Sequence, residues 1–225
     1  MTPSAPVPVQ SLHLADAREA EDLAAFLARL IHYDRAAAVR LQASGGALAV
    51  FGRPPSFEVL AIRTARLGED VELDVTVSAG ELLESLGGTD CGVPAAVTGP
   101  PWAGLLPPRS GWRELAALPD VDAMRGAVAA AVAEFRTRDE ALPAARRTRA
   151  ERDRIGREIW SRTVGGTGLP LRAVHAAQSL GFLRPGVPVA LLSAGAWLRL
   201  RTPFGSVAVR TTGLGTLSVT PRRPG

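Results

Sequence analysis

The chain has 225 residues and a formal net charge of +4, from 26 basic and 22 acidic residues. It contains neither Lys nor Asn, so all 26 basic residues are Arg, a composition typical of a GC-rich bacterial genome. The absence of Lys excludes Schiff-base catalysis and the lysines of P-loops and kinases. A single Cys, Cys91, cannot form an intramolecular disulfide, as is typical of a reducing cytoplasm.

The chain shows no sign of membrane targeting. Residues 1–15 carry three Pro and no basic start, unlike a signal peptide. The uncharged stretch 185–198 is too short to span a bilayer. We therefore expect a cytoplasmic protein without a membrane partner.

The first half predicts a helix packed on an antiparallel sheet. Apolar residues recur at helical spacing over 12–34, where Asp16 and Glu19 have the spacing of a capping box. Ser78 and Glu81 form a second capping box for a short helix. The strands predicted between the two helices are 39–42, 47–51, 57–65 and 71–77, with a Ser44-Gly45-Gly46 turn after the first.

Residues 87–112 contain six Gly and five Pro, which predicts a long loop or linker. Trp102 and Trp112 lie in it. Either these rings are anchors of a loop that binds a ligand or partner, or each Trp pins the loop to the body. The second arrangement is the more common one, because long loops are often held by their own large side chains.

The second half predicts three helices and a β-meander. Asp120 is a candidate N-cap of the first helix, which Pro143 ends, and Pro170 and Gly181 bound the third. The highly charged stretch 144–163 between them has several Arg–acid pairs at i, i+4 spacing, which favours a solvated, ion-paired helix. The strands predicted after the helices are 187–192, 196–201, 206–211 and 216–220.

The predicted fold class is therefore α+β, and the order of three helices and a hairpin allows a winged-helix-like arrangement of the second half. A long connection at 164–169 and the number of strands argue against a winged helix. The expected organisation is a flexible N-terminus 1–11, an acidic α+β unit 12–90, a Gly/Pro-rich linker or loop 91–112, a basic helical plus β-meander unit 113–220 and a tail 221–225.

Charge is distributed unevenly along the chain. Residues 1–112 carry a net charge of −5 and residues 113–225 carry +9, with no acid after Glu158. Such asymmetry is typical of proteins with an anionic partner. The alternative is that the basic half packs on the acidic half of the same chain, or on a partner subunit.

The third predicted helix presents polar side chains on one face, as a DNA recognition helix does. On this interpretation Arg172, His175 and Gln178 read bases or position the helix. The arginines expected to contact phosphate are Arg184, Arg199, Arg201 and Arg210. The scarcity of aromatic residues argues against a stacking platform for single strands.

Common catalytic and metal-binding motifs are missing from the sequence, so we expect neither a cofactor, nor a metal, nor catalytic residues. Residues 165–168 form a Gly-rich turn before a helix that could cradle a phosphate, but the pattern is incomplete. His32 has no evident catalytic partner, and Cys91 lies beside Asp90, which disfavours a reactive thiolate.

The leading hypothesis is a cytoplasmic nucleic-acid-binding protein, with duplex DNA as the main candidate, that acts in transcription regulation or another DNA-associated process. The alternative is a non-catalytic protein-interaction scaffold or homo-oligomer, a homodimer for example, whose basic half docks on an acidic surface.

Overall fold

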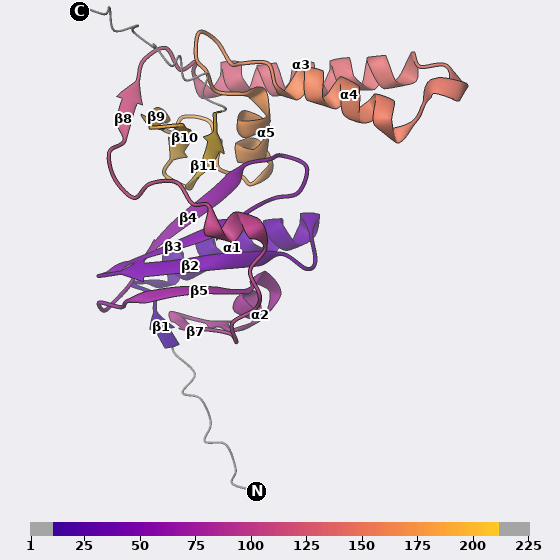
Figure 1. Ribbon diagram of the computed structural model, residues 1–225. Coiled ribbons are helices and arrows are strands. Elements are labelled where there is room, and N and C mark those ends of the chain that lie inside the picture. Colours follow the sequence, from indigo (N-terminus) through magenta and orange to yellow (C-terminus); the bar gives the residue numbers. More distant parts are fainter. Residues whose placement is uncertain (1–10, 212–225) are drawn as a thin grey trace, which may run out of the picture.

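The computed structural model describes residues 11–211, and the fold class is α+β, as predicted (Figure 1). The elements of the first half are β1 (Ser11–His13), α1 (Ala17–Tyr33), β2 (Ala38–Ser44), β3 (Ala47–Gly52), β4 (Leu60–Arg66), β5 (Leu73–Ser78), α2 (Ala79–Glu84), β6 (Leu86–Gly87) and β7 (Asp90–Gly92). The second half has η1 (Pro101–Gly104), β8 (Arg113–Leu115), α3 (Val121–Glu140), η2 (Ala144–Arg146), α4 (Arg149–Trp160), α5 (Leu171–Ser179), β9 (Ala190–Ala194), β10 (Trp197–Thr202) and β11 (Gly205–Arg210).

Both predicted capping boxes begin helices. The Asp16 carboxylate accepts a hydrogen bond from the Glu19 amide at 3.0 Å, and the Ser78 hydroxyl accepts one from the Glu81 amide at 3.4 Å. The first helix begins later than predicted, at Ala17, because the preceding residues form β1 and pair with β7. Local capping chemistry thus fixed the two helix starts, whereas the strand before α1 depends on a distant partner.

Four other predictions need correction or lie outside the described part. The strand expected from residue 57 begins only at Leu60, because Ser56 and Glu58 have positive φ angles that break extended structure. Residues 1–10 and 212–225 are not described, so the predicted strand 216–220 and the tail are not placed, and of the predicted N-terminal segment 1–11 only Ser11 is described, in β1.

Eight strands form one antiparallel sheet in the order β5-β2-β3-β4-β11-β10-β9-β8. The two halves of the chain meet where β4 pairs with β11, with Ala61 opposite Val207. β10 and β11 are therefore interior strands of a sheet shared by both halves. The winged-helix arrangement is not confirmed by this topology. A separate small sheet contains β1, β7 and β6.

The helices cover one face of the large sheet, and we call the opposite face the open face. Along β2, for example, Val39 and Leu41 are buried beneath α1, whereas Arg40 and Gln42 point to the open face. α1 packs on β4 and against α2, and α5 packs on β10 and β11. Period-2 alternation thus separates an apolar helix face from a more polar open face.

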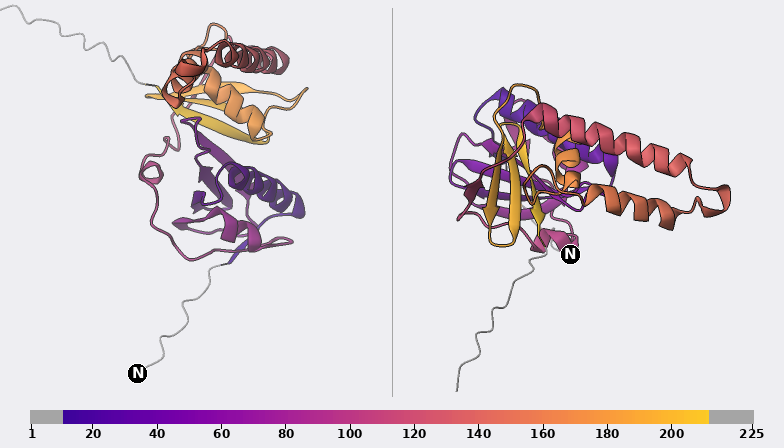
Figure 2. Two further views of the ribbon diagram at one scale, coloured as in Figure 1. Left: turned by 90° about the vertical axis from the view of Figure 1, so that its right-hand side faces the viewer. Right: turned by 90° about the horizontal axis from the view of Figure 1, so that it is seen from above.

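Residues 93–112, which we call the crossing segment, pass over the open face. Figure 2 (left) shows this segment on one side of the sheet and α1 on the other. Trp102 packs against a second apolar cluster on this face, so this ring does pin the segment to the body. The buried members of that cluster are Phe51, Leu60, Ile62 and Ala208.

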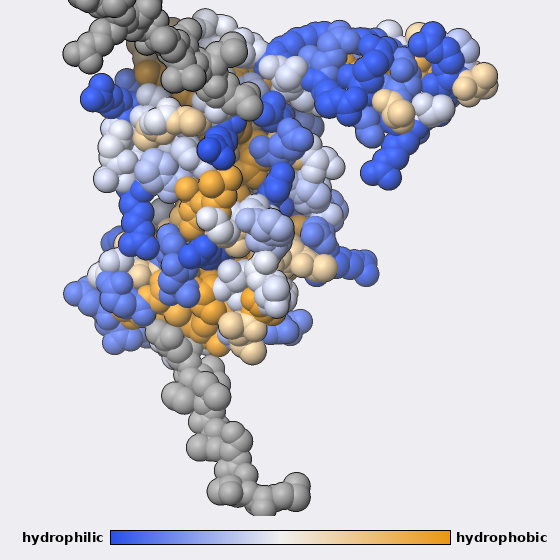
Figure 3. All heavy atoms as spheres, viewed as in Figure 1, coloured by the Kyte–Doolittle hydropathy of each residue, from blue (hydrophilic) through white to orange (hydrophobic). Residues whose placement is uncertain are grey.

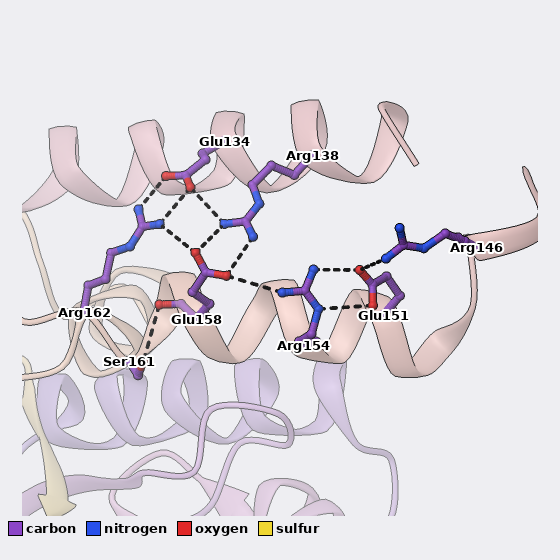
Figure 4. A network of polar contacts seen from close by, with 8 residues as sticks. All are labelled: Glu134, Arg138, Arg146, Glu151, Arg154, Glu158, Ser161 and Arg162. Atoms are coloured by element: carbon purple, nitrogen blue, oxygen red, sulfur yellow. Dashed lines mark hydrogen bonds and ion pairs between the residues drawn. The ribbon is translucent and has the colours of Figure 1, made fainter. Parts of the chain in front are cut away.

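Helices α3 and α4 form a hairpin that projects from the body (Figure 1). Figure 4 shows a ladder of ion pairs between them, in which Arg138 reaches Glu158 at 2.7 Å and Arg162 reaches Glu134 at 2.5 Å. These contacts hold the pKa of Glu134 down to about 2, with the hydrogen bond from Arg162 as the main cause. The expectation of a solvated, ion-paired helix is confirmed. Within residues 11–211, every helix is too short or too polar to cross a bilayer.

A substitution at Gly205 tests how closely the helix layer packs on the sheet. The φ angle of Gly205 is +147°, and a Cβ at this position would lie 2.6 Å from the Phe182 ring, which stacks on Phe26 of α1. We expect Gly205→Ala to lower the free energy of unfolding by about 2–3 kcal/mol, because overpacking adds to backbone strain. Urea denaturation measures the change.

Gly186→Ala is the matched control. Gly186 also has a positive φ angle, +72°, but a Cβ there meets nothing within 4 Å. This variant should lose only about 1 kcal/mol from backbone strain. Equal losses in the two variants would show that the fit of Phe182 is not the cause.

Candidate functional site

The residues predicted to read DNA bases lie on α5, which is enclosed by other elements. α5 contacts α3, α4, β10 and β11. The His175 ring stacks on Trp160 with 4.4 Å between centroids and meets the edge of Phe57 at 5.0 Å. Nε of Arg172 and Oε1 of Gln178 are buried. The position of these three side chains gives a recognition-helix role no support.

The four predicted phosphate contacts lie on two different faces. Arg184 follows α5, and its guanidinium carbon lies 3.6 Å above the Phe204 ring centroid. Arg199 and Arg201 on β10 and Arg210 on β11 point to the open face, by the alternation of their strands. The structure thus separates Arg184 and the α5 residues from the three strand arginines.

The acidic half of the chain is not neutralised by the late arginines. Among those that the structure describes, Arg172 alone has an acidic partner in the first half, Glu58 at 3.9 Å. Arg162 pairs instead with acids of its own half. Arg222 and Arg223 lie outside the described residues.

The open face holds a pocket of about 420 Å³ between the sheet and the crossing segment. Its floor is apolar, with Phe51, Ile62 and Ala49, and its polar lining includes Gln42 and Thr64. Two arginines complete the lining: Arg109 from the crossing segment and Arg199 from β10. Figure 3, which views the open face, shows hydrophobic residues gathered at its centre with hydrophilic ones around them.

Arg199 is a half-buried cation that lacks a carboxylate. Its Nε donates a hydrogen bond to the Ser206 hydroxyl at 2.8 Å, and its guanidinium carbon lies 5.8 Å from the Trp112 ring centroid. No carboxylate within residues 11–211 pairs with it, and residues 1–10 and 212–225 contain no Asp or Glu. Burial, with a smaller contribution from Arg201, lowers the pKa of this side chain. Burying an uncompensated charge costs free energy that a bound anion would recover.

Arg40 anchors the crossing segment to the sheet. Arg40 donates two hydrogen bonds to Asp74, at 2.7 and 2.9 Å, and a third to the backbone carbonyl of Ala103. Gln42 also donates to Asp74 at 3.1 Å. These contacts, the Arg40 bonds above all, hold the pKa of the Asp74 carboxyl below its usual range. The pocket wall formed by the segment is therefore tied to β2 and β5.

Sequence reasoning singled out Arg199 but missed Arg109 and the floor of the pocket. The signal for Arg109 was its position in the Gly/Pro-rich stretch beside Trp112. In and around the Gly-rich turn 165–168, the amides of Val164, Thr167 and Leu169 are bonded within the turn. Cys91 is buried, and its pKa is raised by burial. Among the described residues, no group of three or more His, Cys, Asp or Glu could hold a metal ion.

Residues 7–104 match the model of a domain of unknown function (DUF8010), and residues 107–214 match that of a second domain of unknown function (DUF8185). The two matches adjoin within the crossing segment. The Arg109–Arg199 pocket therefore takes its floor from the first domain and both of its arginines from the second. No curated protein matches the chain.

The half-buried position of His175 predicts a pH dependence of stability. Burial lowers the pKa of this imidazole below 6.5, so the folded chain holds it neutral where the unfolded chain binds a proton. Its contribution to stability is therefore complete above about pH 6.5 and is lost as the pH falls, by at most about 1.4 kcal/mol per pH unit. The measurement is urea denaturation at pH 7.5 and at pH 5.5.

His175→Phe keeps the stacked ring and removes the titrating group. It should lose less stability than the wild type between these pH values, while His13 and His32 remain in both proteins. An equal loss in the two proteins would contradict the role of His175.

The uncompensated charge of Arg199 predicts that Arg199→Met raises the midpoint of thermal unfolding. The substitution keeps an aliphatic side chain over the apolar floor and removes a charge whose burial is unfavourable. Arg201→Met, on the same strand and face but exposed, is the control and should change the free energy of unfolding by less than about 0.5 kcal/mol. A lowered midpoint for Arg199→Met would contradict the account of its charge.

Proposed function

We propose that the protein is a binding protein for a small organic anion, which it holds in the pocket between Arg109 and Arg199. The ligand would place a carboxylate or phosphate between the two guanidinium groups and an aliphatic body over Phe51 and Ile62. The proposal rests above all on one observation, the half-buried, unpaired cation of Arg199 above an apolar floor.

The chemistry of the lining agrees with this ligand class. Guanidinium groups bind carboxylates and phosphates through paired, charge-assisted hydrogen bonds. A volume of about 420 Å³ lies within the range of small-ligand pockets, which is about 300–1,000 Å³. A mostly apolar pocket with a few convergent polar groups is the common form of such sites.

The DNA-binding hypothesis from the sequence has weaker support. The three α5 residues are half-buried, and four arginines, Arg138, Arg146, Arg154 and Arg162, already pair with Glu134, Glu151 or Glu158. What favours DNA is the pair of exposed arginines on the open face, Arg201 and Arg210. Neither lies in the Arg109–Arg199 pocket, so the two hypotheses depend on different residues.

Isothermal titration calorimetry with octanoate tests the proposal, with 1-octanol as the uncharged control. We expect octanoate to bind more tightly than 1-octanol. Arg199→Gln should weaken octanoate binding about tenfold or more, since a hydrogen bond to a charged group contributes about 1.5–3 kcal/mol. Arg201→Gln is the matched control and should bind octanoate like the wild type.

Duplex DNA forms the second arm of the experiment. Fluorescence anisotropy at several salt concentrations would show whether DNA affinity falls linearly in log[salt], as phosphate contacts require. Salt-dependent DNA binding that Arg201→Gln or Arg210→Gln weakens, together with no octanoate binding, would overturn the proposal in favour of a nucleic-acid protein. Equal binding of octanoate by wild type and Arg199→Gln would also contradict it.

A further inference from the structure

A second pocket lies on the open face, on the other side of the apolar cluster from the first. It has a volume of about 310 Å³. Its walls come from the loop after β3, from η1 and from β10 and β11. Its lining shares no residue with the Arg109–Arg199 pocket.

Two indole rings line this second pocket. Trp102 comes from the crossing segment and Trp197 from β10, and both pack against the apolar cluster of the open face. Leu105 lies beside them with 48% of its surface exposed, although large apolar side chains are usually covered. Indole faces in a concave site are suited to a planar ring, which can stack on either of them.

The same pocket carries two cations without acidic partners. Arg53 and Arg210 are exposed, and no carboxylate within residues 11–211 forms an ion pair with either. The sequence outside that range contains no Asp or Glu that could supply one. Glu58, the acidic group of the lining, points its carboxylate to within 3.9 Å of Arg172 on α5. The pocket therefore combines a stacking surface with an excess of positive charge.

The wall formed by the loop after β3 is held in a strained conformation. Ser56 and Glu58 have φ angles of +69° and +52°, in the left-handed region that residues other than Gly rarely adopt. Phe57 between them packs against Tyr33 and His175, which holds the loop in this shape. Strain of this kind gathers at binding sites, where the surrounding packing fixes a loop before the ligand arrives.

We propose that this second pocket binds a planar aromatic ring that carries an anionic group, such as a mononucleotide or an aromatic carboxylate. The ring stacks on Trp102 or Trp197, and the anionic group lies between Arg53 and Arg210. Neither the aliphatic ligand of the first pocket nor its two arginines are needed for this site.

Isothermal titration calorimetry with AMP tests the inference, with adenosine as the probe that keeps the ring and lacks the charge. We expect AMP to bind at least about tenfold more tightly than adenosine, because the phosphate gains charge-assisted hydrogen bonds. The double variant Arg53→Gln/Arg210→Gln should reduce AMP affinity to that of adenosine. The same titration with indole-3-acetate distinguishes a mononucleotide from an aromatic carboxylate as the ligand. Whichever of AMP and indole-3-acetate binds more tightly is the better model of the ligand.

Two variants separate this site from the first. Trp197→Leu should weaken the binding of AMP and of adenosine alike, since it removes a stacking surface and leaves both arginines in place. Arg199→Gln should leave AMP binding unchanged while it weakens octanoate binding. The proposal for one site can therefore be contradicted without affecting the proposal for the other. Circular dichroism and thermal melting check that each variant is folded.

Three results would overturn the inference. One is the absence of binding by AMP and by indole-3-acetate at millimolar concentration. Another is measurable binding of AMP with an affinity equal to that of adenosine. The third is an AMP affinity that the double variant Arg53→Gln/Arg210→Gln, when folded, does not lower.

Discussion

The pairing of β4 with β11 is the constraint on which the rest of the structure depends. Only three residue pairs form it, and they join two four-stranded halves into one sheet. Side chains alternate along both strands, so this register places Ile62 and Ser206 together on the open face. Arg199 is bonded to Ser206, and the pairing therefore brings a cation of the second half above an apolar floor of the first.

Arg63 on the helix face and Arg199 on the open face have different kinds of partner. On the helix face Arg63 is almost fully buried, and its guanidinium lies 2.9 Å from Asp22 and 3.4 Å from Glu19, both on α1. This pair ties α1 to β4, and the loss of one partner from such a buried pair is commonly costly. On the open face Arg199 has a hydroxyl instead of a carboxylate. The first arrangement is complete within the chain, whereas the second leaves charge available for a ligand.

Sequence reasoning succeeded where the determining contacts are local. The capping boxes at Asp16 and Ser78, the hairpin turn at residues 44–46 and the i, i+4 pair of Arg154 with Glu158 in α4 all involve residues a few positions apart. It reached less far where distant contacts decide. The polar face of α5 looked like a surface for DNA, but Phe57, more than a hundred residues earlier, packs against His175 on that face.

The candidate site as a whole could not be predicted from the sequence for the same reason. Arg109, Arg199 and Ile62 are far apart along the chain, and a strand pairing and a loop crossing bring them together. The net charge of the second half drew attention to its arginines, but it could not say which arginines are paired. Residues 113–158 hold ten of the 18 Arg of the second half but also all nine of its acids, so the net charge of +9 comes almost wholly from the eight Arg of residues 159–225.

The boundary between the two matched domains lies between residues 104 and 107, in the middle of the crossing segment. If the segment only linked two independent units, it would not need anchors on the sheet. Instead, Arg40 of the first domain bonds the Ala103 carbonyl, and Trp102 packs on a cluster built from β3, β4 and β11. The segment is therefore a structural part of both pockets, and each pocket has walls from both domains. A binding site made in this way requires the two domains to stay joined as one sheet.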